Sequence, residues 1–133
     1  MDKSVKENYL NVVGKPNKAG FILRRAQFIN EVVPVMEAFN SAIPDLQVSG
    51  HIYVSFSTES GTLGRHRSKS SVFFWQAIGQ TQWTVTTKRG DETYILKPND
   101  AIYCPSLMYH DVVPLSPRVG ISLGLDHLYK KRC

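Results

Sequence analysis

Two of the four histidines stand where they could bind a metal ion or take part in acid–base chemistry. His66 precedes an apolar stretch at 72–78, and His110 ends the segment 105–110. In an extended chain alternate residues share a face, so His66 and Ser68 would point the same way, and a β-barrel could bring His110 beside them. Taken alone, the residues favour ordinary polar or core histidines over a metal or catalytic site. His51 and His127 lack such a setting and are expected to be structural.

The chain that must position these residues changes character near residue 45. Over 24–40, apolar residues recur every three or four positions, which predicts a helix that Pro34 should kink or split. After Pro44 the sequence breaks into short β-rich stretches separated by Gly, Pro, Asn and Asp, which is typical of a sandwich or barrel. The expected strands are 47–56, 72–78, 82–87, 92–96, 101–104, 109–113 and 119–123, with a hairpin turn at 88–91.

Length and composition fit one domain with its own core. The chain has 133 residues and a mass of 15.0 kDa, and 42% of its residues are hydrophobic, which excludes wholesale disorder. We expect residues 1–45 to form a helical N-terminal segment that packs on a barrel formed by residues 46–133. The charged first residues and the lack of a long apolar run predict a soluble, cytoplasmic protein without membrane partners. Cys104 and Cys133 are too few for a disulfide framework or a Cys-rich zinc site.

The formal net charge is +5, from 16 Lys and Arg against 11 Asp and Glu. The basic residues are dispersed along the sequence and no nucleic-acid-binding motif accompanies them, so nucleic acid is not a favoured partner. A basic nucleic-acid-associated domain stays open as the third interpretation, and it predicts a steep salt dependence of polynucleotide binding. Arg65, Arg67 and Lys69 do gather in a Gly- and Ser-rich segment at 57–71. Such a loop could attract an anionic substrate, including a phosphate-bearing one, to a barrel mouth, or it could simply be solvated.

The motifs around the second histidine resemble those of the cupin superfamily. Residues 96–110, LKPNDAIYCPSLMYH, are similar to the second cupin motif, in which a Pro-Gly-Asp turn leads into a strand, a Pro turn and a metal-ligating histidine. Residues 72–83, VFFWQAIGQTQW, resemble the JmjC-like pattern of an apolar strand followed by Gln, Gly and Trp, and residues 114–124 are similar to the closing strand. The resemblance covers about residues 50–125. It implies a mainly β cupin fold, a double-stranded β-helix or jelly-roll barrel.

The JmjC-like oxygenases that the chain resembles bind Fe(II) with a His-x-Asp/Glu pair and a distal His, and they use 2-oxoglutarate and O₂. Matching the motifs puts the first ligand at His66, the distal ligand at His110 and the carboxylate position at Ser68. Because a serine hydroxyl is neutral, metal affinity should fall below that of an intact triad. Another carboxylate could replace it, a water or an anion could fill the gap, or the metal could have been lost. The carboxylates nearby in sequence are Glu59, Asp100 and Asp111, of which Asp111 should point away from His110.

The same resemblance implies a cationic anchor for the distal carboxylate of 2-oxoglutarate. One branch of the family has a lysine just before the strand-ending glycine, where this chain has Ile78. Arg118 resembles the arginine that other members place after the distal His, and it is the candidate anchor; the alternative is a solvent-facing charge at the start of a strand. The further pocket candidates are Gln76, Tyr53 and Tyr103, with Ser55 and Tyr94 as additional hydroxyls.

We therefore predict a cupin-like protein related to 2-oxoglutarate/Fe(II)-dependent oxygenases, with an atypical metal site and an unidentified small-molecule or protein substrate. The alternative is a non-catalytic cupin that binds a small anion or a protein partner without metal, which Ser68 and Ile78 favour. A homodimer is compatible with either, because cupins often dimerise and an edge strand near the N-terminus could mediate the pairing.

Overall fold

The structure is a computed structural model, and it describes residues 20–26, 29–59 and 63–127. Their regular elements follow one another as β1 (Gly20–Arg24), α2 (Val33–Ala42), β2 (Leu46–Ser55), β3 (Ser71–Ile78), β4 (Thr81–Thr87), β5 (Gly90–Leu96), β6 (Ala101–Cys104), β7 (His110–Pro114) and β8 (Arg118–His127). Every strand expected from the sequence is present. In the described ranges, no helix is both long enough and apolar enough to cross a membrane.

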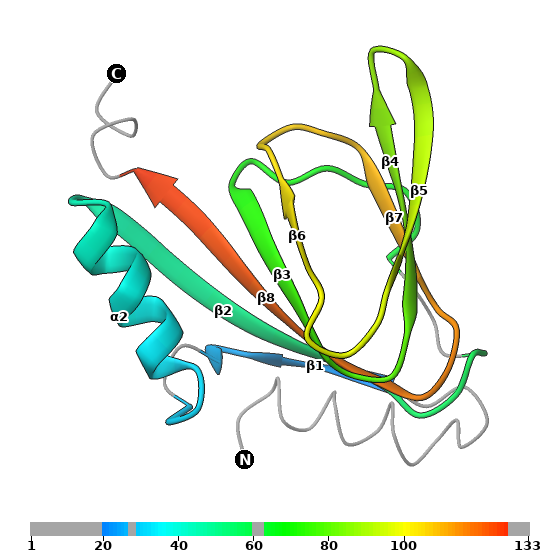
Figure 1. The fold of residues 1–133 in the computed structure, drawn as a ribbon, viewed down its shortest axis with the longest axis horizontal. Coiled ribbons are helices and arrows are strands. Elements are labelled where there is room, and N and C mark those ends of the chain that lie inside the picture. Colours follow the sequence, from blue (N-terminus) through cyan, green and yellow to red (C-terminus); the bar gives the residue numbers. More distant parts are fainter. Residues whose placement is uncertain (1–19, 27–28, 60–62, 128–133) are drawn as a thin grey trace.

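The strands form two antiparallel sheets. The larger sheet has the order β1-β2-β8-β3-β6, and the smaller has the order β5-β4-β7. The pairing registers define two ends of the barrel. We call one the histidine end, where the β4–β5 turn and the loop before β7 lie, and the other the Arg118 end, where β3 turns into β4 and β7 into β8. Figure 1 shows the sheets close together at the Arg118 end and separated at the histidine end.

Alternating burial along the strands explains how the sheets enclose a core. In β3 and β4 every second residue is buried, as expected for strands with one face toward an apolar interior. The inner side chains Phe74 and Trp83 lie 4.9 Å apart by ring centroid and join the two sheets. The remaining buried members of this inner core are Val72, Val85, Leu96 and Cys104. These contacts hold the two sheets at the separation that the site requires.

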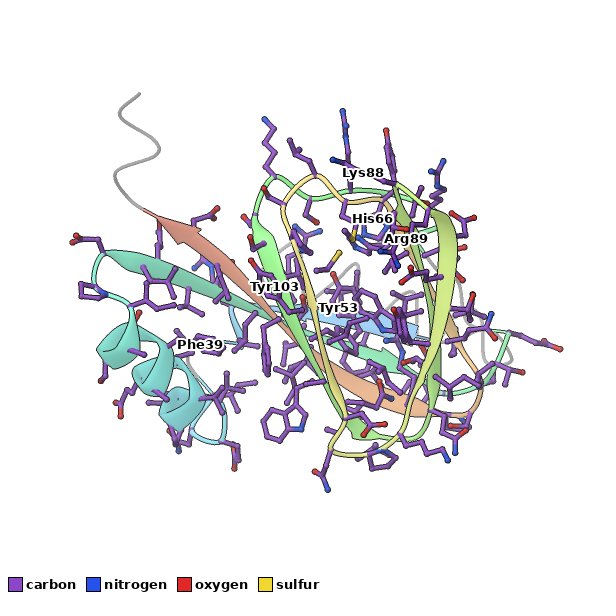
Figure 2. The ribbon with its side chains drawn as sticks, turned by 45° about the horizontal axis from the view of Figure 1, so that its top comes forward. Phe39, Tyr53, His66, Lys88, Arg89 and Tyr103 are labelled. Atoms are coloured by element: carbon purple, nitrogen blue, oxygen red, sulfur yellow. The ribbon has the colours of Figure 1, made fainter. Side chains whose placement is uncertain are left out.

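A second apolar cluster covers the outer face of the larger sheet. Val32 is buried with Ile121 and Leu123 of β8, and the partly buried side chains of α2 pack around them. Phe39 of α2 meets Phe73 of β3 edge-on at 5.3 Å between ring centroids. Figures 1 and 2 show α2 beside β2 and β8, on the side away from the smaller sheet. The helix therefore backs the sheet and leaves the barrel interior to β-strand side chains.

The structure corrects the sequence prediction in the N-terminal part of the chain. The helix begins at Val33 and not near residue 24, because Pro34 fits the first turn of a helix, where no N–H donor is needed, better than its interior. Residues 20–24 form a strand, β1, which pairs with β2. The segment expected to be helical therefore also adds an edge strand to the larger sheet; the domain boundary at residue 45 stays a prediction.

Gly120 is required by the packing of the inner core. A Cβ atom at this position would lie 2.1 Å from Cζ of Phe74, so the ring would have to move. We expect Gly120→Ala to lower the free energy of unfolding by about 1–3 kcal/mol, the usual cost of overpacking a core. Urea denaturation measures it. Gly124→Ala is the control in the same strand, because its Cβ would meet the small Ser49 hydroxyl; an equal cost for both variants would contradict this packing.

Candidate functional site

His66 and His110 are neighbours in the structure. Their backbones form a reciprocal antiparallel bridge, in which the His66 N–H donates to the His110 carbonyl at 2.9 Å and the His110 N–H donates back at 2.8 Å. The two ring centroids lie 4.3 Å apart. Because a bridged pair in this geometry directs both side chains to the same face, the two imidazoles converge at the histidine end of the barrel. The convergence expected from the motif order is therefore present.

Backbone contacts fix the tautomer of both rings. Nδ1 of His66 lies 2.8 Å from the Gly64 carbonyl oxygen, and Nδ1 of His110 lies 3.0 Å from that of Met108. A carbonyl oxygen only accepts, so each Nδ1 donates and each Nε2 keeps its lone pair. Burial lowers the pKa of His110 below 6.5 and the neighbouring His66 acts in the same direction, whereas the bond to Met108 opposes the shift. A neutral imidazole with a free Nε2 is the form that binds metal ions.

Two buried side chains flank His110. The indole ring of Trp83 stacks on it at 5.4 Å between centroids and 20° between planes. The sulfur of Cys104 lies 3.5 Å from its Nδ1, and burial raises the pKa of this thiol. The indole Nε1 of Trp83 is buried without a hydrogen-bond partner among the described residues. The sequence patterns assigned both residues to the core; their contacts to His110 depend on which strand faces which, and no pattern within the chain signals that.

No carboxylate completes the pair of histidines. Within the described part of the chain, no three His, Cys, Asp or Glu residues lie close enough to hold a metal ion together. Asp100 is excluded as a substitute ligand, since its carboxylate accepts the Lys97 N–H at 2.9 Å in a turn at the Arg118 end. Asp111 pairs with Thr84, on the opposite face of the sheet from His110, as strand alternation predicts.

Glu59 is exposed, whereas Ser68 is half-buried and runs beside the loop that precedes His110, where its carbonyl oxygen accepts the Leu107 N–H at 2.8 Å. The described residues therefore offer two imidazoles and no carboxylate beside them, which does not fit an intact two-histidine, one-carboxylate iron site.

Arg118 is the buried cation of the barrel. Its side chain is 6% exposed, and its Nε–H donates to the Ser55 hydroxyl at 3.0 Å. The guanidinium carbon lies 5.7 Å from the centroid of the Tyr53 ring. Burial lowers the pKa of Arg118, partly opposed by Tyr53, and no carboxylate of the described residues forms an ion pair with it. The alternative of a solvent-facing charge at the start of β8 is therefore wrong, and Ile78, which replaces the lysine anchor, is exposed.

The other predicted pocket residues differ in where they point. Tyr53 is on the inner face, and burial raises the pKa of its hydroxyl. Gln76 is fully buried, but its amide bonds to Thr81 and to two backbone carbonyls of the β3–β4 turn, so it holds the turn and is not free for a ligand. Tyr103 was wrongly placed in the pocket. It pairs with Phe73 on the outer face and is 58% exposed, because its side chain points to the opposite face of the strand from that of its neighbour Cys104.

A row of aromatic rings lies between the two histidines and Arg118. From the histidine end, the ring of His110 meets Trp83, Trp83 meets Phe74 at 4.9 Å, and Phe74 meets Tyr53 at 6.4 Å, beside the Arg118 guanidinium. Figure 2 shows Tyr53 in the interior and His66 at the open end above it. The chemistry of the barrel is therefore an apolar, aromatic interior with a cation at one end and two imidazoles at the other.

Comparison with known proteins gives the fold. No protein-family model matches the chain, and no curated protein matches it in sequence. Among solved structures, it is similar to the Escherichia coli ribosomal oxygenase YcfD, with a TM-score of 0.68 and 21% identity over 80% of this chain and 31% of that chain. Its similarity to a cupin superfamily protein of Desulfitobacterium hafniense has a TM-score of 0.59 and 11% identity, over 82% of this chain and 79% of that one.

A variant of oxalate decarboxylase from Bacillus subtilis is also similar, with a TM-score of 0.61 and 13% identity over 87% of this chain and 28% of that chain. This chain therefore spans under a third of the YcfD chain that it matches. The YcfD structures were determined with cobalt and either succinic acid or 2-oxoglutarate. The protein thus has the mainly β jelly-roll fold of the cupins and JmjC-like oxygenases, as the motifs predicted.

Buried histidines predict a loss of stability in mild acid. Burial lowers the pKa of both His51 and His110 in the folded state, and Arg24 also lowers that of His51. As the pH falls below 6.5, the unfolded chain takes up protons that the folded chain resists, so the free energy of unfolding decreases; above 6.5 this contribution is constant. Urea denaturation at pH 7.5 and 5.0 should show the decrease. The decrease in the free energy of unfolding should be smaller in the double variant His51→Gln/His110→Gln. An identical decrease in that variant would contradict the assignment of the effect to these two histidines.

Proposed function

We propose that this protein binds a small dicarboxylate of the 2-oxoglutarate type inside its barrel, with Arg118 as the anchor. The proposal makes it a relative of the 2-oxoglutarate/Fe(II)-dependent oxygenases in which the carboxylate-binding half of the site is retained and the metal-binding half is incomplete. The observation that supports it is a buried guanidinium that forms no ion pair with any carboxylate of the described residues.

The energetic argument concerns desolvation. Removing a charged group from water costs several kcal/mol unless an opposite charge and hydrogen bonds replace the lost hydration. Arg118 keeps its charge at neutral pH, since a guanidinium does not lose its proton in the physiological range. Only its Nε–H has a partner in the described structure, namely Ser55. Its two terminal nitrogens form the fork that binds a carboxylate with two parallel hydrogen bonds.

The surroundings of Arg118 fit one carboxylate better than a larger anion. Ser55 fixes the guanidinium plane by holding Nε, and the Tyr53 ring lies beside it. The aromatic interior would contact the carbon chain of the ligand, and the unpartnered Trp83 N–H is a donor available to a second polar group. A short dicarboxylate combines a carboxylate for the guanidinium with a short carbon chain and a second polar group. The 2-oxoglutarate and succinate bound to YcfD are ligands of this class.

Metal binding at His66 and His110 is a second candidate function, favoured by their fixed tautomers. Both Nε2 atoms keep their lone pairs, as a divalent first-row metal requires. Bound Fe(II) would supply redox chemistry with O₂ in an oxygenase. The residues fit such a site only in part, because Ser68 offers no negative charge. The Gly64 and Met108 carbonyls hold the two imidazoles in the tautomer that binds a metal ion. We therefore expect this chain to bind a divalent metal weakly.

Arg118→Met tests the anchor. In the unmodified protein, 2-oxoglutarate at about 100 times its Kd should raise the free energy of unfolding by about 2.7 kcal/mol. The Met variant should lose this ligand-induced increase while keeping or improving its stability without ligand, because an unpaired buried charge is replaced by an apolar chain. Thermal denaturation with and without 2-oxoglutarate measures both effects. The control is Arg24→Met, at an exposed position. A ligand-induced increase that persists in Arg118→Met would refute the proposal.

Ser68→Asp tests the metal half independently. Restoring a carboxylate should tighten Co(II) binding at least about tenfold, equivalent to about 1.4 kcal/mol, if Ser68 faces the two imidazoles. Calorimetric titration with Co(II) measures it, and His110→Ala should abolish the gain. Thr93→Asp adds the same charge on the outer face of β5 and should not tighten binding. Equal Co(II) affinity of Ser68→Asp and the unmodified protein would show that position 68 does not complete the site.

A further inference from the structure

Two arginines of the segment before β3 share one aromatic support. The guanidinium carbon of Arg65 lies 4.5 Å from the centroid of the Tyr109 ring, and that of Arg67 lies 5.1 Å from it. Arg65 also donates to the Thr86 hydroxyl at 3.1 Å. Arg65, Arg67 and Tyr109 are all exposed, and the exposed fraction of Tyr109 is 37%. The alternative of a merely solvated loop does not account for these contacts, because they hold two like charges close together at the histidine end of the barrel.

A second basic segment reaches the same place from another part of the chain. Lys88 and Arg89 form the tip of the β4–β5 hairpin, directly after Thr86 and Thr87. The Thr86 N–H donates to the Tyr109 carbonyl oxygen at 2.9 Å, which ties the hairpin to the ring that carries the arginines. Figure 2 shows Lys88 and Arg89 at the same end of the molecule as His66. The fold therefore brings together basic residues that lie about twenty positions apart in the sequence. We call Arg65, Arg67, Lys88 and Arg89 the basic rim.

The basic rim is only partly compensated by acidic groups. Asp91 accepts a hydrogen bond from the Thr86 hydroxyl, and Glu92 accepts one from Tyr94, so both carboxylates are engaged by neutral side chains. Throughout 20–26, 29–59 and 63–127, no carboxylate forms an ion pair with a residue of the basic rim. Four cations therefore face solvent with an excess of positive charge, and a polyanion that neutralised them would release its own counterions.

We propose that the basic rim binds a strand of nucleic acid. Its charges are spread over one segment and the tip of a hairpin, not directed at one point, so they match the repeated phosphates of a polymer better than a single phosphate group. Guanidiniums that already lie against an aromatic ring also present flat faces on which unpaired bases stack. This inference is independent of the dicarboxylate site, since the basic rim and Arg118 lie at opposite ends of the barrel.

The test is the salt dependence of binding to a fluorescein-labelled oligouridylate of about 12 nucleotides, a length within the usual range of single-strand sites. Fluorescence anisotropy gives the association constant at a series of NaCl concentrations. Four phosphate contacts predict a slope of log K against log salt of about −2.8. Lys88→Ser/Arg89→Ser should reduce its magnitude by about 1.4 and weaken binding at least about tenfold at low salt. Arg67→Ser alone should reduce it by about 0.7.

The matched control removes the same charge elsewhere. Arg24→Ser/Arg25→Ser changes two exposed arginines on and after β1, at the far edge of the larger sheet, and should leave both the slope and the affinity unchanged. Circular dichroism confirms that each variant is folded. Equal losses in the control and rim variants would overturn the proposal, because net charge alone would then explain binding. Polyglutamate that competes as well as unlabelled oligouridylate would also overturn it, in favour of an acidic protein partner, as would the absence of binding at low salt.

Discussion

A positive charge held inside an apolar barrel is the constraint on which the account of this protein depends. The Arg118 guanidinium is largely removed from water where β8 begins, beside Ser55 at the end of β2 and the ring of Tyr53. Such a charge is stable only with an anion or with hydrogen bonds that replace its hydration. Among the described residues, the fold supplies one of those bonds, from Ser55, and no partner for the two terminal nitrogens. The anion site that we propose therefore depends on the strand register.

The two ends of the barrel differ in chemistry. At the histidine end, the backbone bridge and the two Nδ1 contacts hold His66 and His110 together, and among the described residues no carboxylate joins them in a metal-binding group. The aromatic rings between them and Arg118 make the two halves of the site chemically separable.

The strand boundaries were predictable because β-favouring residues cluster in short stretches and turn residues separate these stretches. The convergence of His66 and His110 came from motif order. The burial of Arg118 was not predictable, since a cation at the start of a strand is usually solvated and only its register with Ser55 encloses it. The prediction that Tyr103 lines the pocket was wrong for a similar reason, because pairing with Phe73 sets the face to which its side chain points. The basic rim depends on a contact between segments about twenty residues apart, Arg65 with Thr86, which composition cannot show.

The most direct test of the central claim observes the Arg118 guanidinium itself. In an NMR spectrum of arginine Nε–H groups, Arg118 should give a resonance that is slow to exchange with solvent, because its Nε–H is buried and bonded to Ser55; Arg118→Met identifies it by its loss. Titration with 2-oxoglutarate, without added metal, should move this resonance saturably and leave those of exposed arginines such as Arg24 in place. A resonance that does not move at saturating 2-oxoglutarate would contradict the account.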